Sequence, residues 1–343
     1  MPEKIRVAIL GASGYTAREL ILLLLRHPQV EIAAITTRQE GKEGTPLISE
    51  LHPSLYGRLT LRCEALDAPA LARRGVQCAF ACLPHGVSME VVPELLRAGL
   101  RVVDLSADYR LRDPQVYQEW YGETHRDPEH LRLAVYGLPE LYTQRIREAR
   151  LLANPGCYPQ TVILGLAPLV AHDWIDREDI IADSKSGVSG AGRSPRLPTH
   201  FPECNENLAA YSVGRHRHTP EMEQVLSDLA GAPVRVIFTP HLVPMDRGIF
   251  STIYVRPRRA VSEAELFELY RDYYARAPFV RIVPHLPNSK DTTGTNFCDI
   301  TLRLVRDRIV VLACEDNLVR GASGVAVQNF NLMYGFDETT ALW

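Results

Sequence analysis

Strands and helices alternate along the first third of the chain, and this alternation constrains the fold more than any other feature of the sequence. The predicted strands cover residues 5–10, 31–35, 77–83 and 101–105, and the helices between them cover residues 14–26 and 87–98. Parallel strands need a crossover of about a dozen residues or more, and helices supply it. The N-terminal part is therefore predicted to be an α/β domain with a parallel sheet.

The pattern changes from about residue 155 onward. Strands are predicted over residues 234–243 and 249–255, a hairpin over 297–314, and helices over 263–275 and 323–334. Ser262 and Glu265 form a capping box at the start of one of these helices. Hairpins mixed with helices predict an α+β domain with a mixed sheet. Two domains also suit 343 residues, at about 150 residues per domain.

Charge and cysteine content exclude several function classes. The chain has 38 basic and 41 acidic side chains, a net charge of −3, so no basic surface for nucleic acid is expected. No apolar run reaches the roughly 20 residues of a membrane span, and the first residues do not resemble a secretory signal. The seven cysteines are scattered without a C-x-x-C pair. We expect a cytoplasmic protein that binds no nucleic acid, membrane or metal.

The segment GASGYTA, residues 11–17, follows the first predicted strand and opens a helix. Gly11 permits a tight turn, Gly14 lets the backbone approach a pyrophosphate, and the small Ala17 allows close helix–strand packing. An anion would then bind the N–H groups at the helix N-terminus. This predicts dinucleotide binding, and a plain tight turn is the alternative.

The end of the second predicted strand bears on cofactor choice. NAD sites usually have an acid here for the ribose 2′-hydroxyl, whereas NADP sites have an arginine for the 2′-phosphate. This chain has Thr36, Thr37 and Arg38 and no acid at the strand end. We therefore favour NADP, with a solvated surface arginine as the alternative.

The segment NPGCYPQT, residues 154–161, precedes an apolar run. Pro159 is tolerated only in the first turn of a helix, so Cys157 is predicted at or just before a helix N-terminus. The positive end of the helix dipole favours a thiolate over a thiol. Cys157 is therefore the predicted nucleophile, and a structural cysteine is the alternative.

A basic segment, GRHRHTPE at residues 214–221, contains two candidate proton acceptors. Thr219 and Pro220 read as N-cap and first helical residue, which places His218 just before a helix. The helix dipole there favours the neutral imidazole that a general base requires. His218 is the preferred base, His216 is its rival, and the two flanking arginines are candidates for an anionic substrate.

Two further polar segments, residues 184–193 and 240–248, contain serines, a lysine and arginines. They are interpreted as loops that could bind a carboxylate or phosphate, or as ordinary surface loops.

Taken together, these motifs closely resemble the family of N-acetyl-γ-glutamyl-phosphate reductases. The resemblance extends over nearly the whole chain and also rests on LPHGVS (83–88), VDLSADYR (103–110), YGLPEL (136–141), ECNENLAAY (203–211) and DNLVRGASGVAVQN (316–329). It implies a Rossmann domain over residues 1–153 with a C-terminal helix, 318–343, returning to it. It also implies a catalytic and oligomerisation domain over 154–317 and a homo-oligomer, dimer or tetramer.

The chemistry that the resemblance implies is an NADPH-dependent reduction in arginine biosynthesis. Cys157 would attack the acyl phosphate, expel inorganic phosphate and form a thioester. Hydride from NADPH would give a thiohemiacetal, which collapses to the semialdehyde while His218 manages the proton. Covalent catalysis suits this reaction because a thioester accepts hydride more readily than a carboxylate does.

The resemblance also assigns binding residues by position. It adds Ser13, Tyr15, Thr16, Pro84 and Ser106 to the cofactor residues Gly11, Gly14, Thr37 and Arg38 described above, with Asn317 near the nicotinamide. The substrate site is expected to contain Ser186, Arg193, Glu206 and His216.

Two other functions remain open at this stage. One is a related reductase that acts on an acyl phosphate attached to a carrier protein, in lysine or ornithine biosynthesis. Residues 203–208 look more like the enzymes with a free substrate. The other is an NADP-binding sensor without catalysis, against which the cysteine and histidine motifs argue.

Overall fold

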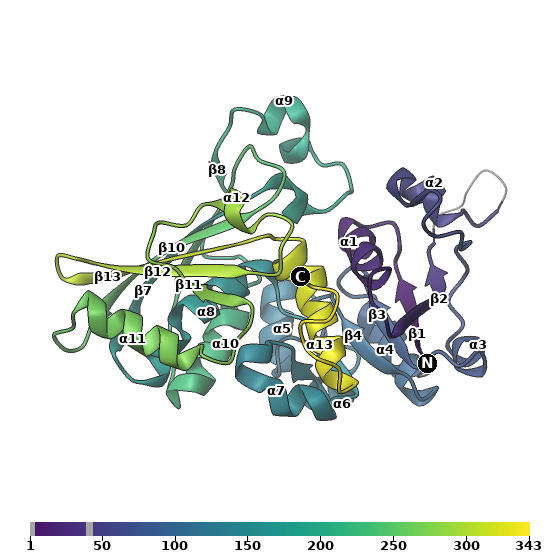
Figure 1. Ribbon diagram of the computed structural model, residues 1–343, viewed down its shortest axis with the longest axis horizontal. Coiled ribbons are helices and arrows are strands. Elements are labelled where there is room, and N and C mark those ends of the chain that lie inside the picture. The colour runs from purple at the N-terminus through teal and green to yellow at the C-terminus, as the bar shows by residue number, and fades with distance from the viewer. Residues whose placement is uncertain (1–3, 39–43) are drawn as a thin grey trace. The chain divides into compact units, whose positions relative to one another are not determined.

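The computed structural model describes residues 4–38 and 44–343. The chain divides into two compact units (Figure 1), of which the first comprises residues 1–155 and 322–343 and the second residues 156–321. A π-helical turn, Val319–Ser323, leads from the second unit back to the first. Each unit has its own sheet.

The first unit is built on a six-stranded sheet in the order β2-β1-β3-β4-β6-β5. All its pairings are parallel, which confirms the α/β prediction. The strands are β1 (Ile5–Leu10), β2 (Val30–Thr36), β3 (Cys78–Ala81), β4 (Arg101–Asp104), β5 (Val135–Tyr136) and β6 (Leu151–Ala153). β5 and β6 were not predicted, because strands of two and three residues show no hydrophobic period.

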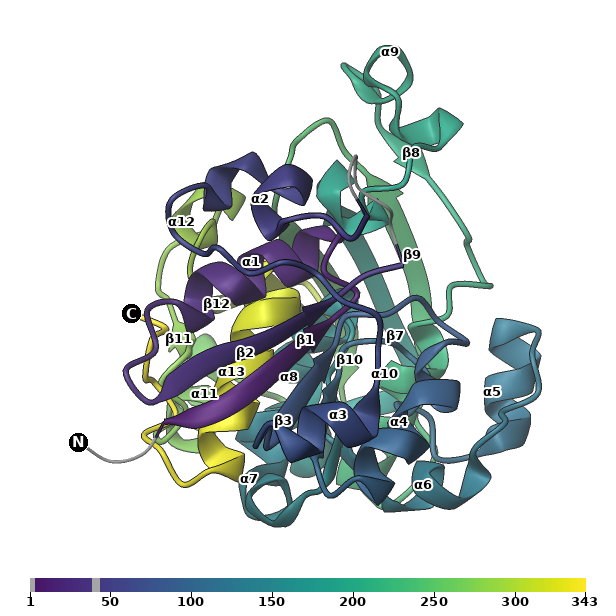
Figure 2. The same ribbon diagram turned by 90° about the vertical axis from the view of Figure 1, so that its right-hand side faces the viewer.

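The first unit also contains eight α-helices within the residues described. They are α1 (Tyr15–Leu24), α2 (Ile48–Leu51), α3 (Ala68–Arg73), α4 (Ser88–Arg97), α5 (Pro114–Tyr121), α6 (Pro128–Leu133), α7 (Pro139–Glu148) and α13 (Gly324–Met333). The C-terminal helix α13 packs against α1 and α7 (Figure 2). All of its residues are buried, which explains why this stretch carries no charged side chain.

The second unit is built on a seven-stranded mixed sheet in the order β11-β12-β13-β10-β7-β9-β8. β10 is antiparallel to β7 and β13, whereas β7 and β9 run parallel. The strands are β7 (Ile175–Ser186), β8 (Ala209–Ala210), β9 (Ile237–Leu242), β10 (Ile249–Pro257), β11 (Val280–Ile282), β12 (Cys298–Val305) and β13 (Arg308–Glu315). The mixed sheet and the β12–β13 hairpin confirm the predicted fold class of this part.

The helices of the second unit are α8 (Cys157–Ala171), α9 (Phe201–Cys204), α10 (Thr219–Ala230), α11 (Glu263–Tyr273) and α12 (Ser289–Thr292). The central helix α8 packs on the sheet and on α10 (Figure 1). Residues 158–170 of α8 are all buried, as expected of a helix that is apolar on every side. A Cβ atom on Gly165 would lie 3.0 Å from Ile253 on β10, so helix and sheet are in close contact there.

The strand β7 corrects the interpretation of residues 184–193 as a loop. β7 continues to Ser186, and residues 188–191 then form a 3-10 turn. The strand was missed because its only apolar run, residues 180–182, is short, whereas residues 176–179 and 183–186 are all polar or charged. From Ile180 onward buried and half-buried side chains alternate, as in a strand with only one fully buried face.

Candidate active site

The glycine loop between β1 and α1 has a backbone that fits a bound pyrophosphate. Gly11 has φ +77°, and a Cβ atom there would lie 2.4 Å from the carbonyl oxygen of Cys82, so only glycine fits. Gly14 is the N-cap of α1. Its carbonyl accepts the N–H of Arg18 at 3.2 Å, so the N–H groups of residues 15–17 precede the helical ladder. A helix N-terminus of this kind favours an anion.

Other candidate cofactor residues of the first unit lie in the glycine loop, at the start of α1 and directly after β2. Ser13, Tyr15 and Thr16 are half-buried in the loop and the first turn of α1. Thr37 and the exposed Arg38 directly follow β2, the neighbour of β1 in the sheet. In a parallel sheet the carboxyl ends of neighbouring strands share one edge, where ligands usually bind.

Pro84 and Ser106 follow β3 and β4 at this edge, and a buried carboxylate holds the second of them. Asp104 accepts hydrogen bonds from the hydroxyls of Ser88 and Ser106, both at 2.7 Å. Burial, together with the nearby Asp108, raises the pKa of Asp104 to about 6. Asp104 therefore fixes the position of Ser106.

Asp108 is a second buried carboxylate that the sequence analysis left without a role. It accepts the N–H groups of Gly86 and Met89, at 2.9 and 3.2 Å, and the hydroxyl of Tyr117 at 2.9 Å. Both acids lie in the VDLSADYR segment, which was the available signal, but only the fold shows which backbone groups they hold.

In the second unit Cys157 is the first residue of α8, where the position of Pro159 predicted the helix N-terminus. The preceding Gly156 donates its N–H to Oε1 of Glu221 at 2.8 Å. A Cβ atom on Gly321 would lie 2.8 Å from Cβ of Cys157. The turn that carries the thiol is therefore fixed by Glu221 and closely packed against a glycine.

The two histidines lie together at the start of α10. His218, rather than Thr219, is the N-cap, so the predicted start of this helix is wrong by one residue. The backbone N–H of His218 donates to Nδ1 of His216 at 3.2 Å, and the two rings are 4.8 Å apart. Burial, with a smaller effect of Arg217, lowers the pKa of His216 to about 4.

Tyr158 connects the starts of α8 and α10. Its ring lies 5.6 Å from that of His216 and 6.1 Å from that of His218. Its hydroxyl accepts a hydrogen bond from the hydroxyl of Tyr211 at 3.0 Å and donates to the carbonyl of His241 at 3.3 Å. Burial raises the pKa of both phenols, that of Tyr211 to about 12. Tyr211 was not identified from the sequence, although it ends the ECNENLAAY segment.

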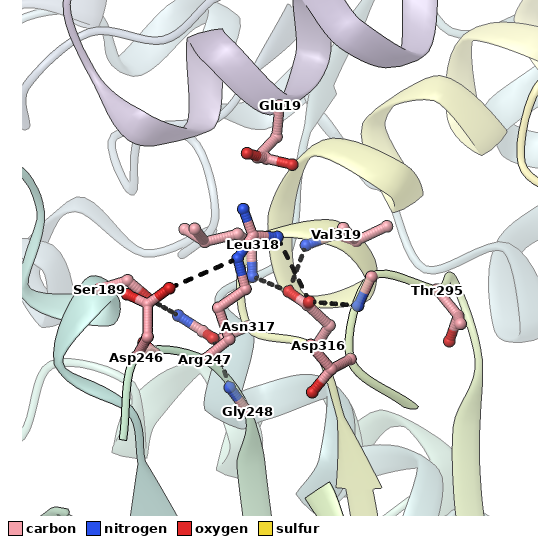
Figure 3. A network of polar contacts seen from close by, with 12 residues as sticks. Glu19, Ser189, Asp246, Arg247, Gly248, Thr295, Asp316, Asn317, Leu318 and Val319 are labelled. Carbon is pink, nitrogen blue, oxygen red and sulfur yellow. Dashed lines mark hydrogen bonds and ion pairs between the residues drawn. The ribbon is translucent and has the colours of Figure 1, made fainter. Parts of the chain in front are cut away.

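Asn317 belongs to a polar network of the second unit (Figure 3). Its Oδ1 accepts the N–H of Gly248 at 2.8 Å, and its Nδ2 donates to the hydroxyl of Ser189 at 3.0 Å. The neighbouring buried Asp316 accepts N–H groups of Leu318 and Val319, at 2.8 and 2.9 Å. The side-chain amide of Asn317 is therefore held in one orientation.

The three remaining substrate candidates lie in different surroundings. Ser186 is buried at the end of β7 and donates to the carbonyl of Gly187 at 3.0 Å. Arg193 and Glu206 are exposed on the segment between β7 and α10. The substrate-binding roles of all three residues stay predictions.

Within residues 4–38 and 44–343, no group of three or more histidine, cysteine or acidic side chains is arranged to hold a metal ion. None of the helices in the same ranges has the length and apolar character needed to span a membrane.

Two protein-family profiles match most of the chain. The family described as "Semialdehyde dehydrogenase, NAD binding domain" matches residues 6–149. The family described as "Semialdehyde dehydrogenase, dimerisation domain" matches residues 157–317.

Several full-length relatives bear the same name, N-acetyl-gamma-glutamyl-phosphate reductase. The protein of Rhodopirellula baltica is 50% identical over 345 residues, covering 99% of each chain. That of Desulforudis audaxviator is 52% identical over 344 residues, and that of Geobacter metallireducens 51% over 343 residues, each covering 98% of both chains.

Solved structures of aspartate semialdehyde dehydrogenases share the fold. Enzyme II from Vibrio cholerae, complexed with ASA, superposes with a TM-score of 0.72 at 18% identity, covering 97% of this chain and 99% of that one. The enzyme from Candida albicans, solved with NADP, gives 0.70 at 15% identity, with the same coverage.

Proposed function

Because the chain belongs to the family of N-acetyl-gamma-glutamyl-phosphate reductases, we propose that it reduces N-acetyl-γ-glutamyl phosphate to N-acetylglutamate semialdehyde with NADPH. The reaction is a step of arginine biosynthesis and releases inorganic phosphate. One observation supports it most: Cys157 begins α8, next to Tyr158, whose ring contacts both histidines at the start of α10. A nucleophile beside candidate bases suits acyl transfer.

In the first step Cys157 forms the covalent bond to the substrate. Its sulfur attacks the acyl carbon, the S–C bond forms, and the C–O bond to phosphate breaks. His218 takes the thiol proton during the attack and returns it to sulfur when the C–S bond breaks at the end of the cycle. The N-terminus of α8 favours the anionic sulfur in both events.

The hydrogen bonding of His216 supports His218 as the base. Nδ1 of His216 accepts the N–H of His218, so its lone pair is used and a neutral ring carries its proton on Nε2. A pKa near 4 keeps this ring neutral at physiological pH. His216 can therefore donate a hydrogen bond to substrate, whereas His218 is the group that accepts the thiol proton.

The first unit would hold the dinucleotide, and this part of the proposal rests on the glycine loop and the N-terminus of α1. Gly11, Ser13, Gly14, Tyr15 and Thr16 would surround the pyrophosphate. Pro84 and Ser106 would line the same edge, and Asn317 would face the nicotinamide. NADPH, when bound, supplies the hydride that reduces the thioester.

Thr37 and Arg38 would give the preference for NADP. Replacing Arg38 by alanine should raise KM for NADPH about tenfold or more, because a charged hydrogen bond contributes about 1.5–3 kcal/mol. KM for NADH should change by less than about twofold, on the same estimate. Arg73→Ala, another exposed arginine of this unit, is the control. Equal losses with both cofactors in Arg38→Ala would contradict this role.

Substrate recognition is assigned to polar groups of the second unit. Ser186 and His216 would bind the acyl group, with Arg193 and Glu206 contributing from the segment between β7 and α10. A cytoplasmic location is part of the proposal, since scattered cysteines without a disulfide pattern suit a reducing compartment.

We also propose a homo-oligomer, dimer or tetramer, formed through the second sheet. On β10 the side chains of Ile249, Ser251, Ile253 and Val255 are fully buried. The alternate residues Phe250, Thr252 and Tyr254 are half-buried or exposed, and Tyr254 is paired with Ile181 on β7 and Val310 on β13. The same face carries the ion pair of Lys185 and Asp183, which lie opposite Phe250 and Thr252. Aromatic side chains among polar groups are typical of protein interfaces, so we assign this face to a second copy.

Tyr254→Arg should therefore weaken self-association at least about tenfold, since a charge would be buried at the centre of an interface. Sedimentation velocity over a concentration series measures this, with the exposed Tyr56→Arg of the first unit as the control. An unchanged oligomer in Tyr254→Arg would exclude this face.

The direct test of the activity is the reverse reaction. Wild-type protein should reduce NADP⁺ with N-acetylglutamate semialdehyde only when inorganic phosphate is present. No turnover, with NADPH still bound, would contradict the proposal and point to a carrier-borne substrate or a sensor. A carrier-dependent enzyme would be separated from a sensor by activity on the acyl phosphate attached to its carrier protein.

A further inference from the structure

A buried histidine holds the loop between β1 and α1 from outside that loop. Nε2 of His52 lies 2.7 Å from the carbonyl oxygen of Ala12, and the His52 side chain is buried. A carbonyl oxygen only accepts, so Nε2 carries the hydrogen of this bond. His52 lies between α2 and the 3-10 turn Pro53–Leu55, in a part of the chain that the sequence analysis left without a role.

Two N–H groups of this loop are held from the side of β2. The N–H groups of Gly11 and Ala12 both donate to the carbonyl of Thr36, at 3.1 and 3.0 Å. Ala12 therefore has its N–H bonded to β2 and its carbonyl bonded to His52.

Because the peptide bond is planar and trans, the contact of His52 with the Ala12 carbonyl also fixes the direction of the Ser13 N–H. In a trans peptide the C=O and the N–H point in opposite directions. The bond from His52 to the Ala12 carbonyl therefore fixes the N–H of Ser13, in the same peptide, to point away from His52. If this peptide turned over, it would present a carbonyl oxygen where it now presents an N–H. A carbonyl repels an anion, whereas an N–H binds it.

We propose that His52 is a positioning residue for dinucleotide binding, which holds the Ala12–Ser13 peptide so that the Ser13 N–H faces the pyrophosphate. The proposal rests on the dinucleotide binding proposed above. His52 itself does not touch the cofactor. Its own backbone is fixed, since its N–H donates to Ile48 and its carbonyl accepts from Leu55, both at 2.9 Å.

A matched pair of variants tests the hydrogen bond. Glutamine in His52→Gln keeps a donor at a similar reach, whereas methionine in His52→Met has similar length without one. His52→Met should raise Kd for NADPH about tenfold, and His52→Gln should stay within about threefold of wild type. Isothermal titration with NADPH measures both values.

A second ligand separates positioning of the loop from general loss of structure. Adenosine 2′-monophosphate carries the adenosine and the 2′-phosphate but no pyrophosphate, so its Kd should be unchanged in His52→Met. His27→Met is the matched control, because His27 is also buried in this unit and its Nε2 lies 2.8 Å from Asn331 Oδ1. This control should lower the melting temperature without changing Kd for NADPH.

The outcomes are distinct. An unchanged Kd for NADPH in His52→Met would overturn the proposal. So would an equal rise in Kd for both ligands, which would show that His52 only stabilises the fold. If His52→Met does not fold, an increase of tenfold or more in His52→Gln would overturn it. The proposed dinucleotide binding is tested separately, by the affinity of the wild-type protein for NADPH.

Discussion

Replacing Cys157 by serine is expected to lower kcat by at least about 10³-fold, as removal of the nucleophile does in other covalent enzymes. The hydroxyl of serine is far less acidic than a thiol, and the N-terminus of α8 cannot make it a comparable nucleophile. The binding of NADPH should be unchanged, because the substitution replaces only the sulfur atom by oxygen and none of the proposed cofactor contacts is made by Cys157. Steady-state rates and titration with NADPH measure the two effects.

A second half-buried cysteine, to which no catalytic role is assigned, provides the control for this variant. Cys204 lies at the end of α9, in the same unit, and is half-buried like Cys157. Cys204→Ser should keep the wild-type rate. Wild-type activity in Cys157→Ser would contradict the thioester route.

Replacing His218 by asparagine should lower kcat about 10²- to 10⁴-fold, the usual contribution of a general base. His216→Asn should mainly raise KM, because it removes one hydrogen bond to substrate. It should lower kcat about tenfold or less. Both variants are compared by steady-state kinetics with the acyl phosphate as substrate.

The pH dependence separates the two histidines further. Because the pKa of His216 is lowered to about 4, its ring becomes charged only as the pH falls toward 4. Any change of the wild-type rate with pH between pH 5 and 8 therefore reflects the titration of another group. This change should persist in His216→Asn. A larger loss in His216→Asn than in His218→Asn would make His216 the base.

Much of the fold was predictable because the relevant signals are local. The first helix follows from residues 11–17, and the start of α8 follows from Pro159. β7 was missed since polar and charged residues on both sides leave it only a three-residue apolar run, 180–182. The start of α10 was wrong by one residue because His218 itself adopts the N-cap position. The short strands β5 and β6 exist only through their pairing in the sheet.

The candidate site was predictable only in part, because some of its residues belong to local motifs and others are brought together by tertiary contacts. Cys157 and the two histidines belong to short motifs at helix N-termini, and such positions indicate a nucleophile and a general base. The contact of Gly156 with Glu221 and that of Tyr158 with Tyr211 join residues far apart in the chain. The same holds for His52 and the glycine loop. Such partners are identified by tertiary packing, and the sequence motifs carry no sign of them.

The central claim is the covalent thioester on Cys157, and trapping it is the most direct test. Wild-type protein would be mixed with N-acetyl-γ-glutamyl phosphate without dinucleotide, quenched in acid, digested and examined by mass spectrometry. The account predicts one N-acetylglutamyl group on the peptide that contains Cys157, with one phosphate released per adduct and no adduct in Cys157→Ser. Turnover with NADPH but no acyl group on that peptide would contradict it.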